Sequence, residues 1–388
     1  MKNIPAGAET IIKTLENRGF EAYLVGGCVR DMLLGKDPKD FDITTNALPE
    51  QIKSAFEKTI DTGIKHGTVT VIINGMPFEV TTFRNDGDYI DKRRPETVNF
   101  VSDLREDLAR RDFTVNAMAY NRTKGIVDCF GGREDLKSKT VRAVGDPEKR
   151  FSEDALRIMR LVRFCSVLDF VPEKKTYKAA KKLCKNLRFV SAERIFAEFS
   201  KLLVGKRPDL ISDIIASGGL ESFGISGKTS IKKLPLLTSK LELRLFAFIK
   251  ILSLDTDEIS SKLKIKNSIK NYLKKCEAIM FLTPESDDFE IKTALATAGR
   301  EILFDVCEYK TKIEKNDMSD IAKRAEKIIK SAEPYTVSHL KISGKDLENL
   351  GFKGEKIGVM LKALCDSVKR NPENNKRETL ISIAEKLK

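Results

Sequence analysis

The sequence predicts an α+β fold in which a mixed or antiparallel sheet comes first and helices follow to the end of the chain. Short segments rich in Val, Ile, Thr and Phe are confined to the first ~140 residues. The dipeptide Asn74-Gly75 lies between two of them, 68–73 and 76–83, and is the strongest short signal for a hairpin. A hairpin joins antiparallel strands, which argues against a doubly wound sheet. From about residue 148 the apolar residues recur at helical spacing.

The elements can be placed in order along the chain. We expect a strand over 23–25 that ends at a double glycine, a helix over 29–34 and a second strand over 40–44. The polar segment 85–97, with Gly and Pro, predicts a long loop after the hairpin. Later segments of the sheet are expected at 114–120 and 126–130, and amphipathic helices at 156–168, 177–187, 192–204, 241–252 and 321–332.

Composition restricts the classes of function. The 388 residues exceed what one core usually holds, so two to four domains are expected. A net charge of +13 favours a polyanion such as nucleic acid, although a lysine-rich surface that is only solvated would give the same value. The sequence contains no run of 18 apolar residues, so no membrane span is expected. Its seven cysteines are scattered, which favours reduced thiols in a cytoplasm. The two histidines, His66 and His339, are far apart, so hydrolytic or transfer chemistry is expected to use carboxylates.

Two aspartates alternate around one phenylalanine in the predicted strand 40–44. Alternate side chains of a strand share a face, so Asp40 and Asp42 are expected to point the same way, with Phe41 directed into the core. Two carboxylates on one rigid strand can hold a pair of Mg²⁺ ions, and Glu79 is a candidate third if its strand is a neighbour. An Asp-x-Asp at a solvent-facing strand edge would look the same, so the motif alone leaves both interpretations open.

Gly26-Gly27 lies at a turn from strand to helix, just before these aspartates. Glycine lets a backbone N–H approach an anion closely, and the N-terminus of the following helix favours negative charge. Arg30, on the first turn of that helix, can also reach a phosphate. An ordinary tight turn is the alternative. Beside paired aspartates, a phosphate-binding turn predicts phosphoryl or nucleotidyl transfer.

Residues 150–164, RFSEDALRIMRLVRF, predict one amphipathic helix whose polar face carries arginines and no lysine. Asp154, Arg157 and Arg160 are close neighbours on this face, and Arg163 lies further round. The pattern indicates the wall of an anion-binding cleft, with an interdomain salt-bridge helix as the alternative. One carboxylate beside one guanidinium, as in Asp154 and Arg157, would pair with cytosine and adenine and reject guanine and uracil.

Five motifs resemble, in order, those of bacterial class II tRNA nucleotidyltransferases and their poly(A) polymerase relatives. They read LVGGCVRD, DFDITT, RRDFTVNAMAY, EDALRIMRLVRF and FVSAERIFAEFSKLL and lie within residues 24–203. The resemblance implies a polymerase β-like nucleotidyltransferase head that contains the sheet, followed by an all-helical neck, body and tail. The implied domains are 1–147 (catalytic head), 148–206 (neck, base recognition), 207–334 (body) and 335–388 (tail, tRNA binding).

Carried over onto this sequence, the resemblance implies that Asp40 and Asp42 are the catalytic metal ligands, and Glu79 stays a further catalytic candidate from its place on the hairpin. The nucleotide-binding residues that it implies are Gly27, Arg30, Arg111, Asp112, Asp154, Arg157, Arg160 and Arg163. Of these, Gly27 and Arg30 would contact the triphosphate, Asp112 would lie near the ribose, and Asp154 with Arg157 would read the base. From the residues alone, Arg110-Arg111-Asp112 fits a helix N-terminus with local ion pairs equally well.

The implied reaction is template-independent addition of CCA to tRNA 3′ ends from CTP and ATP, with Mg²⁺ as cofactor and a cytoplasmic location. The partners would be the 3′ end and acceptor region of tRNA, with no membrane and no obligatory protein partner. The sequence DKRRP at 91–95 is as in members that add the full CCA. A poly(A) polymerase, or an enzyme that adds only CC or only A, is the alternative. A catalytically inactive RNA-binding homologue is a remote one, because the Asp-x-Asp is intact.

Two lysine clusters in the helical part fit a tRNA backbone, although lysine faces are often only solvated. The first contains Lys174, Lys175, Lys178, Lys181, Lys182 and Lys185, and the second contains Lys262, Lys264, Lys266, Lys270, Lys274 and Lys275.

Overall fold

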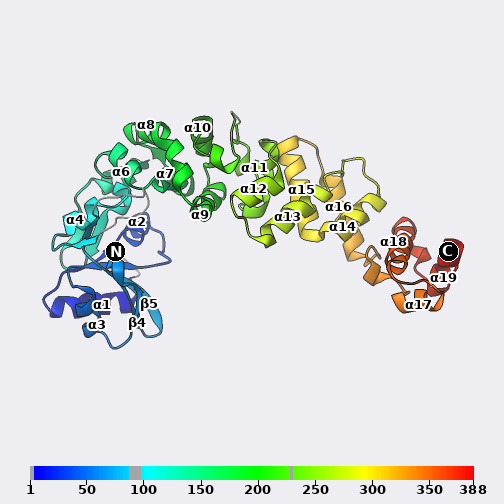
Figure 1. Ribbon diagram of the computed structural model, residues 1–388, viewed down its shortest axis with the longest axis horizontal. Helices are drawn as coiled ribbons and strands as arrows, with labels where there is room; N and C mark the ends of the chain where they lie inside the picture. The colour runs from blue at the N-terminus through cyan, green and yellow to red at the C-terminus, as the bar shows by residue number, and fades with distance from the viewer. Residues whose placement is uncertain (1–3, 87–97, 228–229) are drawn as a thin grey trace. The chain divides into compact units, whose positions relative to one another are not determined.

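The structure is a computed structural model that describes residues 4–86, 98–227 and 230–388. The chain divides into two compact units, residues 1–230 and 231–388, and Figure 1 labels their elements. This division separates the chain at one place, and the four-part division into head, neck, body and tail stays a prediction. Within the described part of the chain, no helix combines the length and apolar character needed to cross a membrane. Residues 87–97, most of the predicted loop, lie outside the described residues.

The described residues of the first unit form a seven-stranded sheet in the order β3-β4-β5-β2-β1-β8-β9. Its strands are β1 (Ala22–Val25), β2 (Asp42–Thr45), β3 (Thr59–Gly63), β4 (Thr68–Ile73), β5 (Met76–Thr82), β8 (Met118–Asn121) and β9 (Gly125–Asp128). Strands β2 and β5 are parallel and the other neighbours are antiparallel, so the predicted mixed sheet is confirmed. Asn74 and Gly75 both have positive φ at the β4–β5 turn, as the hairpin signal requires.

Strand β1, which lies inside the sheet between β2 and β8, is buried on both faces, and alternate residues meet different helices. Leu24 lies on the face of α1 (Ala6–Asn17), near Ile12. Tyr23 and Val25 pack on the other face in a cluster with Leu108 of α4 (Leu104–Ala109). Helix α2 (Gly27–Leu33) follows β1 directly, and α3 (Pro49–Ala55) contacts β4 and β5. The sheet is therefore held between helices, and the ends of β1 and β2 stay close to α2.

Several predicted boundaries are wrong. The second strand begins at Asp42 and not at Asp40, so Asp40 and Phe41 precede it. The segment 114–120 is split into a short 3-10 helix, η2 (Thr114–Asn116), and β8. Residues 85 and 86 lie in β6 (Arg84–Asp86), which pairs with β7 (Val98–Phe100) across the predicted loop. Parallel pairing of β10 (Thr140–Val141) with β11 (Val171–Pro172) interrupts the expected helical region. The β6–β7 and β10–β11 pairings join residues that are far apart in the sequence, and strands of two or three residues leave no local pattern to predict them.

The predicted helix over 150–164 is two helices, α6 (Pro147–Glu153) and α7 (Leu156–Leu168). Asp154 separates them, with φ −137° and ψ 105°, outside the helical region. Its Oδ1 accepts a hydrogen bond from the Leu156 N–H at 3.0 Å, so the side chain caps the start of α7. Helix α6 begins after Asp146, whose side chain accepts a hydrogen bond from the Glu148 N–H at 3.1 Å. Asp154 therefore stands half-buried in the break between two helices rather than on a helix face.

The rest of the first unit is helical. Its elements are α5 (Gly132–Lys137), α8 (Lys174–Leu183), η3 (Cys184–Phe189), α9 (Ala192–Leu203) and α10 (Ile211–Ala216). Helix α7 packs along α9, and its predicted apolar residues Ile158, Met159 and Val162 are buried. Leu161 and Phe164 are buried as well, so α7 is enclosed on most sides, and Val167 near its C-terminus is exposed.

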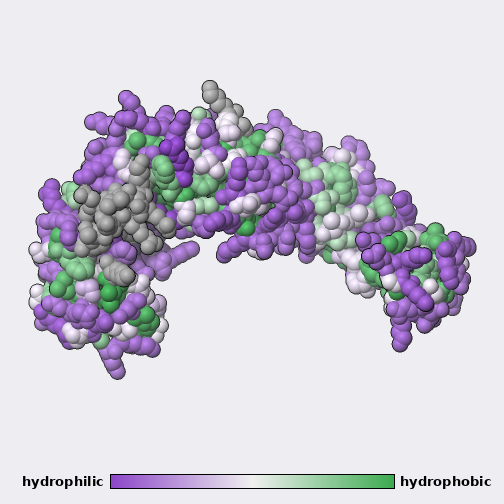
Figure 2. Space-filling view, viewed as in Figure 1, coloured by the Kyte–Doolittle hydropathy of each residue, from purple (hydrophilic) through white to green (hydrophobic). Residues whose placement is uncertain are grey.

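The second unit consists of helices in its described residues. They are α11 (Leu241–Ile251), α12 (Thr256–Lys262), α13 (Asn267–Ala278), α14 (Asp288–Ala298), α15 (Arg300–Tyr309), α16 (Ser319–Lys330), α17 (Gly344–Asn349), α18 (Glu355–Arg370) and α19 (Arg377–Lys386). Leu347, Leu364 and Leu380 join α17, α18 and α19 in a separate apolar cluster near the C-terminus. Hydrophilic side chains cover most of the visible surface of each unit in Figure 2.

Substitution of Gly132 tests the packing that supports the head. A Cβ at Gly132 would lie 2.3 Å from the Thr114 backbone oxygen, so α5 and η2 must separate. We expect Gly132→Ala to lower the free energy of unfolding by about 1–3 kcal/mol or more, measured by urea denaturation. Gly358→Ala on α18, where a Cβ meets nothing within 4 Å, is the control and should be neutral or slightly stabilising. Equal effects of the two substitutions would contradict the predicted close contact.

Candidate active site

Asp42 and Glu79 lie side by side at one end of the sheet. Ile43 of β2 is in register with Val80 of β5, and the two acids each precede one of these partners by one residue in parallel strands. Their side chains therefore leave the same face of the sheet. Glu79 was a candidate third carboxylate only if its strand lay next to the strand of Asp42, and β5 is indeed a neighbour of β2. Asp40 stands two residues before Asp42 on the segment that leads into the strand.

The three acids line a hollow of about 620 Å³. Lys39, Phe41 and Thr70 also contribute to its wall. Phe41 is half-buried there, so the expectation that it points into the core is wrong, because the strand has not yet begun at that residue. The hollow is open to solvent, and the carboxylates of Asp40, Asp42 and Glu79 form part of its wall.

Like charges are concentrated in this hollow. Partial burial of the carboxylate raises the pKa of Asp42, and the charges of Glu79 and Asp40 raise it further, against an opposing effect of Arg111. A divalent cation bound beside these three carboxylates would offset the repulsion that acts on Asp42. Within residues 4–86, 98–227 and 230–388, no three His, Cys, Asp or Glu side chains are already gathered tightly enough to form a metal cluster. The donor set nevertheless fits a hard cation, because all of its ligands are oxygens.

The turn after β1 requires glycine at Gly26. Gly26 has φ 79° and ψ −129°, and a Cβ there would lie 2.9 Å from Nη1 of Arg111. Gly27 is the first residue of α2, and a Cβ there would meet only Nη2 of Arg30 at 3.7 Å. Of the two glycines, Gly26 is therefore the one whose missing side chain lets a distant residue, Arg111, lie against the turn.

Arg30 and Arg111 stand on either side of this turn. The Arg30 guanidinium binds Asp31 (Nε–Oδ1, 2.9 Å) and donates from Nη1 to Oδ1 of Asn116 at 2.6 Å. Arg111 donates from Nη2 to Oδ2 of Asp107 at 3.4 Å, and its Nε is buried without a hydrogen-bond partner among the described residues. A buried donor of this kind is costly unless an acceptor arrives. Arg111 also acts on the charge of Asp42, so an anion between the two would meet both the turn and the acids.

Asp112 is buried and accepts hydrogen bonds from two other residues of the site. Its Oδ1 accepts from Nδ2 of Asn116 at 3.2 Å, and its Oδ2 accepts from Nε of Arg160 at 2.7 Å. Burial alone would raise the pKa of Asp112, but the charge of Arg160 and these hydrogen bonds lower it. Asn116 thus links Asp112 to Arg30, which joins the glycine turn to the arginines of α7.

Phe164 is the common contact of three arginines. The guanidinium carbons of Arg163, Arg160 and Arg30 lie 3.7, 5.2 and 5.4 Å from the centre of its ring. Each distance is within the range of a cation–π interaction. Glu198 of α9 forms ion pairs with both Arg160, at 3.5 Å, and Arg163. The ring and the carboxylate hold three cations together that would otherwise repel.

The two predicted base-reading residues have separate partners. Oδ2 of Asp154 accepts from Nη2 of Arg194 at 2.8 Å, and Nη1 of Arg194 is buried without a hydrogen-bond partner among the described residues. Arg157 is buried, and its Nη1 donates to Oε2 of Glu153 at 2.6 Å. The Arg157 N–H donates to the Asp154 carbonyl at 3.0 Å, so the two residues are adjacent on the chain turn that starts α7.

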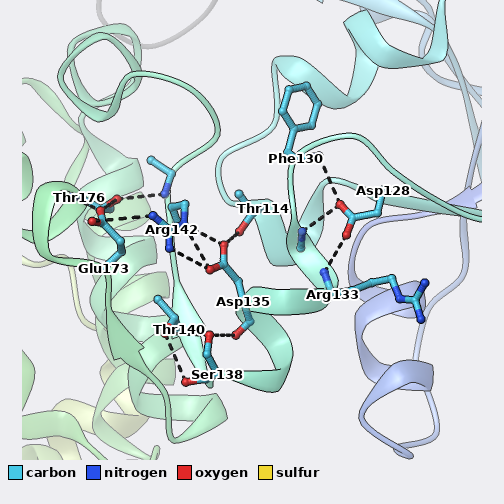
Figure 3. Close-up of polar contacts among 12 residues, drawn as sticks. Thr114, Asp128, Phe130, Arg133, Asp135, Ser138, Thr140, Arg142, Glu173 and Thr176 are labelled. Carbon is cyan, nitrogen blue, oxygen red and sulfur yellow. Dashed lines mark hydrogen bonds and ion pairs between the residues drawn. The ribbon is translucent and has the colours of Figure 1, made fainter.

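A set of polar contacts, which we call the polar frame, joins η2 and α5 to the start of α8 (Figure 3). Asp135 of α5 accepts from Thr114 Oγ1 at 2.6 Å and from Nε of Arg142 at 3.1 Å. Arg142 also lies 3.8 Å from Glu173, which caps α8 through the Thr176 N–H at 2.8 Å. The frame fixes Thr114, two residues after Asp112, to the first turn of α8.

Sequence reasoning missed the residues that hold the arginines. Asp107, Asn116, Glu153, Phe164, Glu198 and Arg194 are all in contact with predicted site residues. Glu153 was within reach of a spacing argument, because it lies four residues before Arg157 on the chain. The others pair across the fold, where no local pattern marks them.

The comparisons agree with this architecture. The family model described as "Poly A polymerase head domain" matches residues 22–142, and the one described as "Probable RNA and SrmB- binding site of polymerase A" matches residues 169–220. The fold and the acid-and-arginine site therefore define a nucleotidyltransferase-type protein with a poly A polymerase head.

Similarity over nearly the whole length identifies the family. The crystal structure of the Bacillus stearothermophilus CCA-adding enzyme in complex with CTP is 34% identical, with a TM-score of 0.85 over 98% of this chain and 96% of that one. This chain belongs to the family of CCA-adding enzymes.

Two curated relatives carry the same description over a shorter region. The CCA-adding enzyme of Lactobacillus helveticus is 56% identical over 51% of this chain and 50% of its own length. The CCA-adding enzyme of Pediococcus pentosaceus is 48% identical over 60% of this chain and 58% of its own length. The chain thus spans little more than half the length of the curated relatives that it matches.

Asp42 should make opposite contributions to stability and to cation binding. Its pKa is raised above the ordinary value of 3.8, so the folded state disfavours the ionised form once the pH rises above that value. We expect Asp42→Asn to raise the Tm of the metal-free protein at neutral pH, and this gain should disappear below about pH 4. Mg²⁺ or Mn²⁺ should raise the Tm of the wild type and not that of the variant.

The exposed Glu57→Gln substitution is the matched control, since it removes one carboxylate of the same unit away from the hollow. It should change neither the Tm nor the response to the cation. A lower Tm for Asp42→Asn at neutral pH, or an unchanged cation response, would contradict the assignment.

Proposed function

We propose that this chain adds CMP and AMP to the 3′ ends of tRNA, without a nucleic-acid template, to form CCA. The observation that carries the proposal is the joint placement of Asp40, Asp42 and Glu79 around one hollow and of the buried, unpartnered Nε of Arg111 beside them. The similarity to the Bacillus stearothermophilus enzyme, whose structure contains CTP, supports the choice of nucleotide.

In the proposed reaction, the tRNA 3′-hydroxyl attacks the α-phosphate of CTP or ATP. A bond forms between O3′ and the α-phosphorus, the bond from that phosphorus to the bridging oxygen breaks, and pyrophosphate leaves. Mg²⁺ held by Asp40 and Asp42 would activate the hydroxyl and offset charge on the leaving group when bound. Glu79 stands next to Asp42 and strengthens the negative potential that attracts the cation.

The triphosphate is assigned to the glycine turn. Gly27 leaves room for a phosphate beside Arg30, and Arg30 is held in place by Asp31 and Asn116. The unpartnered Nε of Arg111 supplies a donor on the side of the acids. Asp112 is braced by Arg160, and we assign both to the ribose side of the nucleotide, with Arg163 behind them. Preorganised cations of this kind stabilise charge that develops on the phosphate without reorganisation.

Base selection is assigned to Asp154 and Arg157. Cytosine and adenine both present an amino donor next to a ring-nitrogen acceptor, which an acceptor–donor pair satisfies. Guanine and uracil present the reverse and would leave buried groups unpaired. Arg194 holds Asp154, and its free Nη1 is a further donor at the same corner.

A poly(A) polymerase is the second candidate, because the family model for residues 22–142 carries that description. The head alone does not distinguish the two activities, and partial enzymes that add only CC or only A share it. We also propose the predicted four domains, with base recognition in 148–206 and tRNA contacts toward the C-terminus. The seven cysteines are all free thiols, which favours a reducing, cytoplasmic setting.

Nucleotide incorporation into truncated tRNA tests the function directly. We expect labelled CTP to extend tRNA that lacks CCA, and ATP alone to add a single A to tRNA that ends in CC. Asp42→Ala should reduce both rates by roughly a thousandfold or more, because the metal ligand is lost. Continued A addition would establish a poly(A) polymerase instead, and no incorporation by the wild type would reject both.

The lysine cluster on α8 is the better-placed of the two for tRNA. Lys174, Lys175 and Lys178 are exposed and have no carboxylate partner within 4 Å in the part of the chain that the structure describes. Lys174 and Lys175 occupy the first turn of α8, where positive charge opposes the helix dipole, so they do not serve helix stability. In the second cluster, three of the six lysines form ion pairs, Lys262 with Glu258 and both Lys270 and Lys274 with Asp257.

This difference predicts unequal effects on tRNA binding. The triple substitution Lys174→Ala, Lys175→Ala and Lys178→Ala should weaken tRNA binding about tenfold or more and reduce the slope of log K against log salt by about two to three. The matched control is Lys262→Ala, Lys270→Ala and Lys274→Ala, which should have a smaller effect. Filter binding or fluorescence anisotropy over a salt series measures both. A larger effect of the second triple would reverse the assignment.

A further inference from the structure

Asp107 is a fully buried carboxylate that connects three parts of the proposed site. It lies on α4 and has no exposed surface. Its Oδ2 accepts from Oγ1 of Thr44 at 3.2 Å, and Thr44 is two residues after Asp42 on β2. Its Oδ1 accepts from the backbone N–H of Arg84 at 3.4 Å, at the start of β6. One side chain therefore touches the strand of the metal ligand and the strand that leads into the 87–97 segment.

The same carboxylate holds two consecutive arginines. Nε and Nη2 of Arg110 donate to Oδ1 at 3.0 and 2.7 Å, and Nη2 of Arg111 donates to Oδ2 at 3.4 Å. Neighbouring guanidiniums repel, and a shared buried counter-charge is what allows both to stay beside each other. For Arg111, this contact is the protein hydrogen bond that orients the guanidinium while its Nε stays unpartnered.

The charge state of Asp107 is set by these contacts. Burial alone would raise the pKa of Asp107, but the charges of Arg110 and Arg111 outweigh it and lower the pKa. The carboxylate therefore stays ionised at neutral pH. Asp107 is also connected, through Arg110, to Arg157, the residue proposed to read the nucleotide base. The Arg110 carbonyl accepts a hydrogen bond from Nη2 of Arg157 at 3.2 Å.

We infer that Asp107 is a positioning residue that orients Arg111 toward the nucleotide phosphates and fixes the Arg110 backbone on which Arg157 rests. The inference rests on the proposed function, since it gives Arg111 a nucleotide to bind. Asp107 itself lies beneath the arginines and contacts no substrate. It acts on nucleotide affinity irrespective of the base, because the phosphates are common to CTP and ATP.

The test is nucleotide binding by the full-length Asp107→Asn variant, which keeps the shape and removes the charge. We expect the affinities for CTP, ATP and inorganic tripolyphosphate to fall together by about tenfold or more, measured by isothermal titration calorimetry with Mg²⁺. The KM values for both nucleotides should rise by a similar factor, with a smaller change in kcat. Unchanged affinities, or a loss confined to one nucleotide, would overturn the inference.

A second variant separates orientation from folding. Asp107→Asn leaves two buried cations unbalanced, and Asp107→Asn with Arg110→Gln removes one of them, so its Tm should recover. Tripolyphosphate affinity should stay low in the double variant because Arg111 is still not held. Recovery of affinity together with the Tm would show a merely structural role and would overturn the inference. Glu134→Gln, which removes an exposed carboxylate from α5 of the same unit, is the control and should bind as the wild type does.

The readouts also separate this inference from the proposed function. A wild type that binds nucleotides and tripolyphosphate but adds nothing to tRNA would reject the function, while the binding data would still decide the role of Asp107.

Discussion

The site depends on one electrostatic constraint, which is that many guanidinium groups must stay close together inside a folded protein. The structure meets it by giving each arginine a carboxylate from the fold. The pairs are Arg30 with Asp31, Arg110 and Arg111 with Asp107, Arg157 with Glu153, Arg160 with Asp112, Arg163 with Glu198, and Arg194 with Asp154. Without these partners, mutual repulsion and desolvation would spread the cations apart. A site that is nearly neutral when empty can still present several donors at fixed positions to an incoming triphosphate.

The same arginines connect the sheet to the helices that follow it. Nη2 of Arg150 donates to the Ala109 carbonyl at 2.8 Å, and Nη2 of Arg157 donates to the Arg110 carbonyl at 3.2 Å. These carbonyls end α4, where the helix dipole favours positive charge. Arg157, which we propose reads the base, is thus anchored on the residue that precedes Arg111. The residues proposed for the base and for the phosphates are therefore connected through one short stretch of backbone.

Much of this arrangement could be predicted from the sequence, and the limits have a physical cause. The hairpin, the mixed sheet and the run of helices follow from turn chemistry and periodicity, which are local. Asp42, Arg30 and Arg157 were reached from local patterns, namely alternating acids, a glycine turn before a helix and an arginine-rich helix, and the order of the motifs then added a family resemblance. The structure brings Asp42 beside Glu79. Asp107 and Glu198 could not be found in this way, because an acid that pairs across the fold looks like any surface acid in the sequence. The break at Asp154 was missed because its side chain caps α7 through a hydrogen bond that periodicity does not reveal.

Carboxylates of the same unit therefore have different surroundings, and those surroundings shift their pKa values in opposite directions. Asp107 and Asp112 have pKa values lowered by arginines that already occupy their oxygens, so they have little capacity left for a ligand. Asp42 has a raised pKa, first because its carboxylate is partly desolvated and then because Glu79 and Asp40 add negative charge beside it. A native structure retains such a cost mainly where function requires it. For Asp42, Asp107 and Asp112, the direction of the pKa shift follows the surroundings of each carboxylate, which the spacing of Asp residues in the chain does not contain.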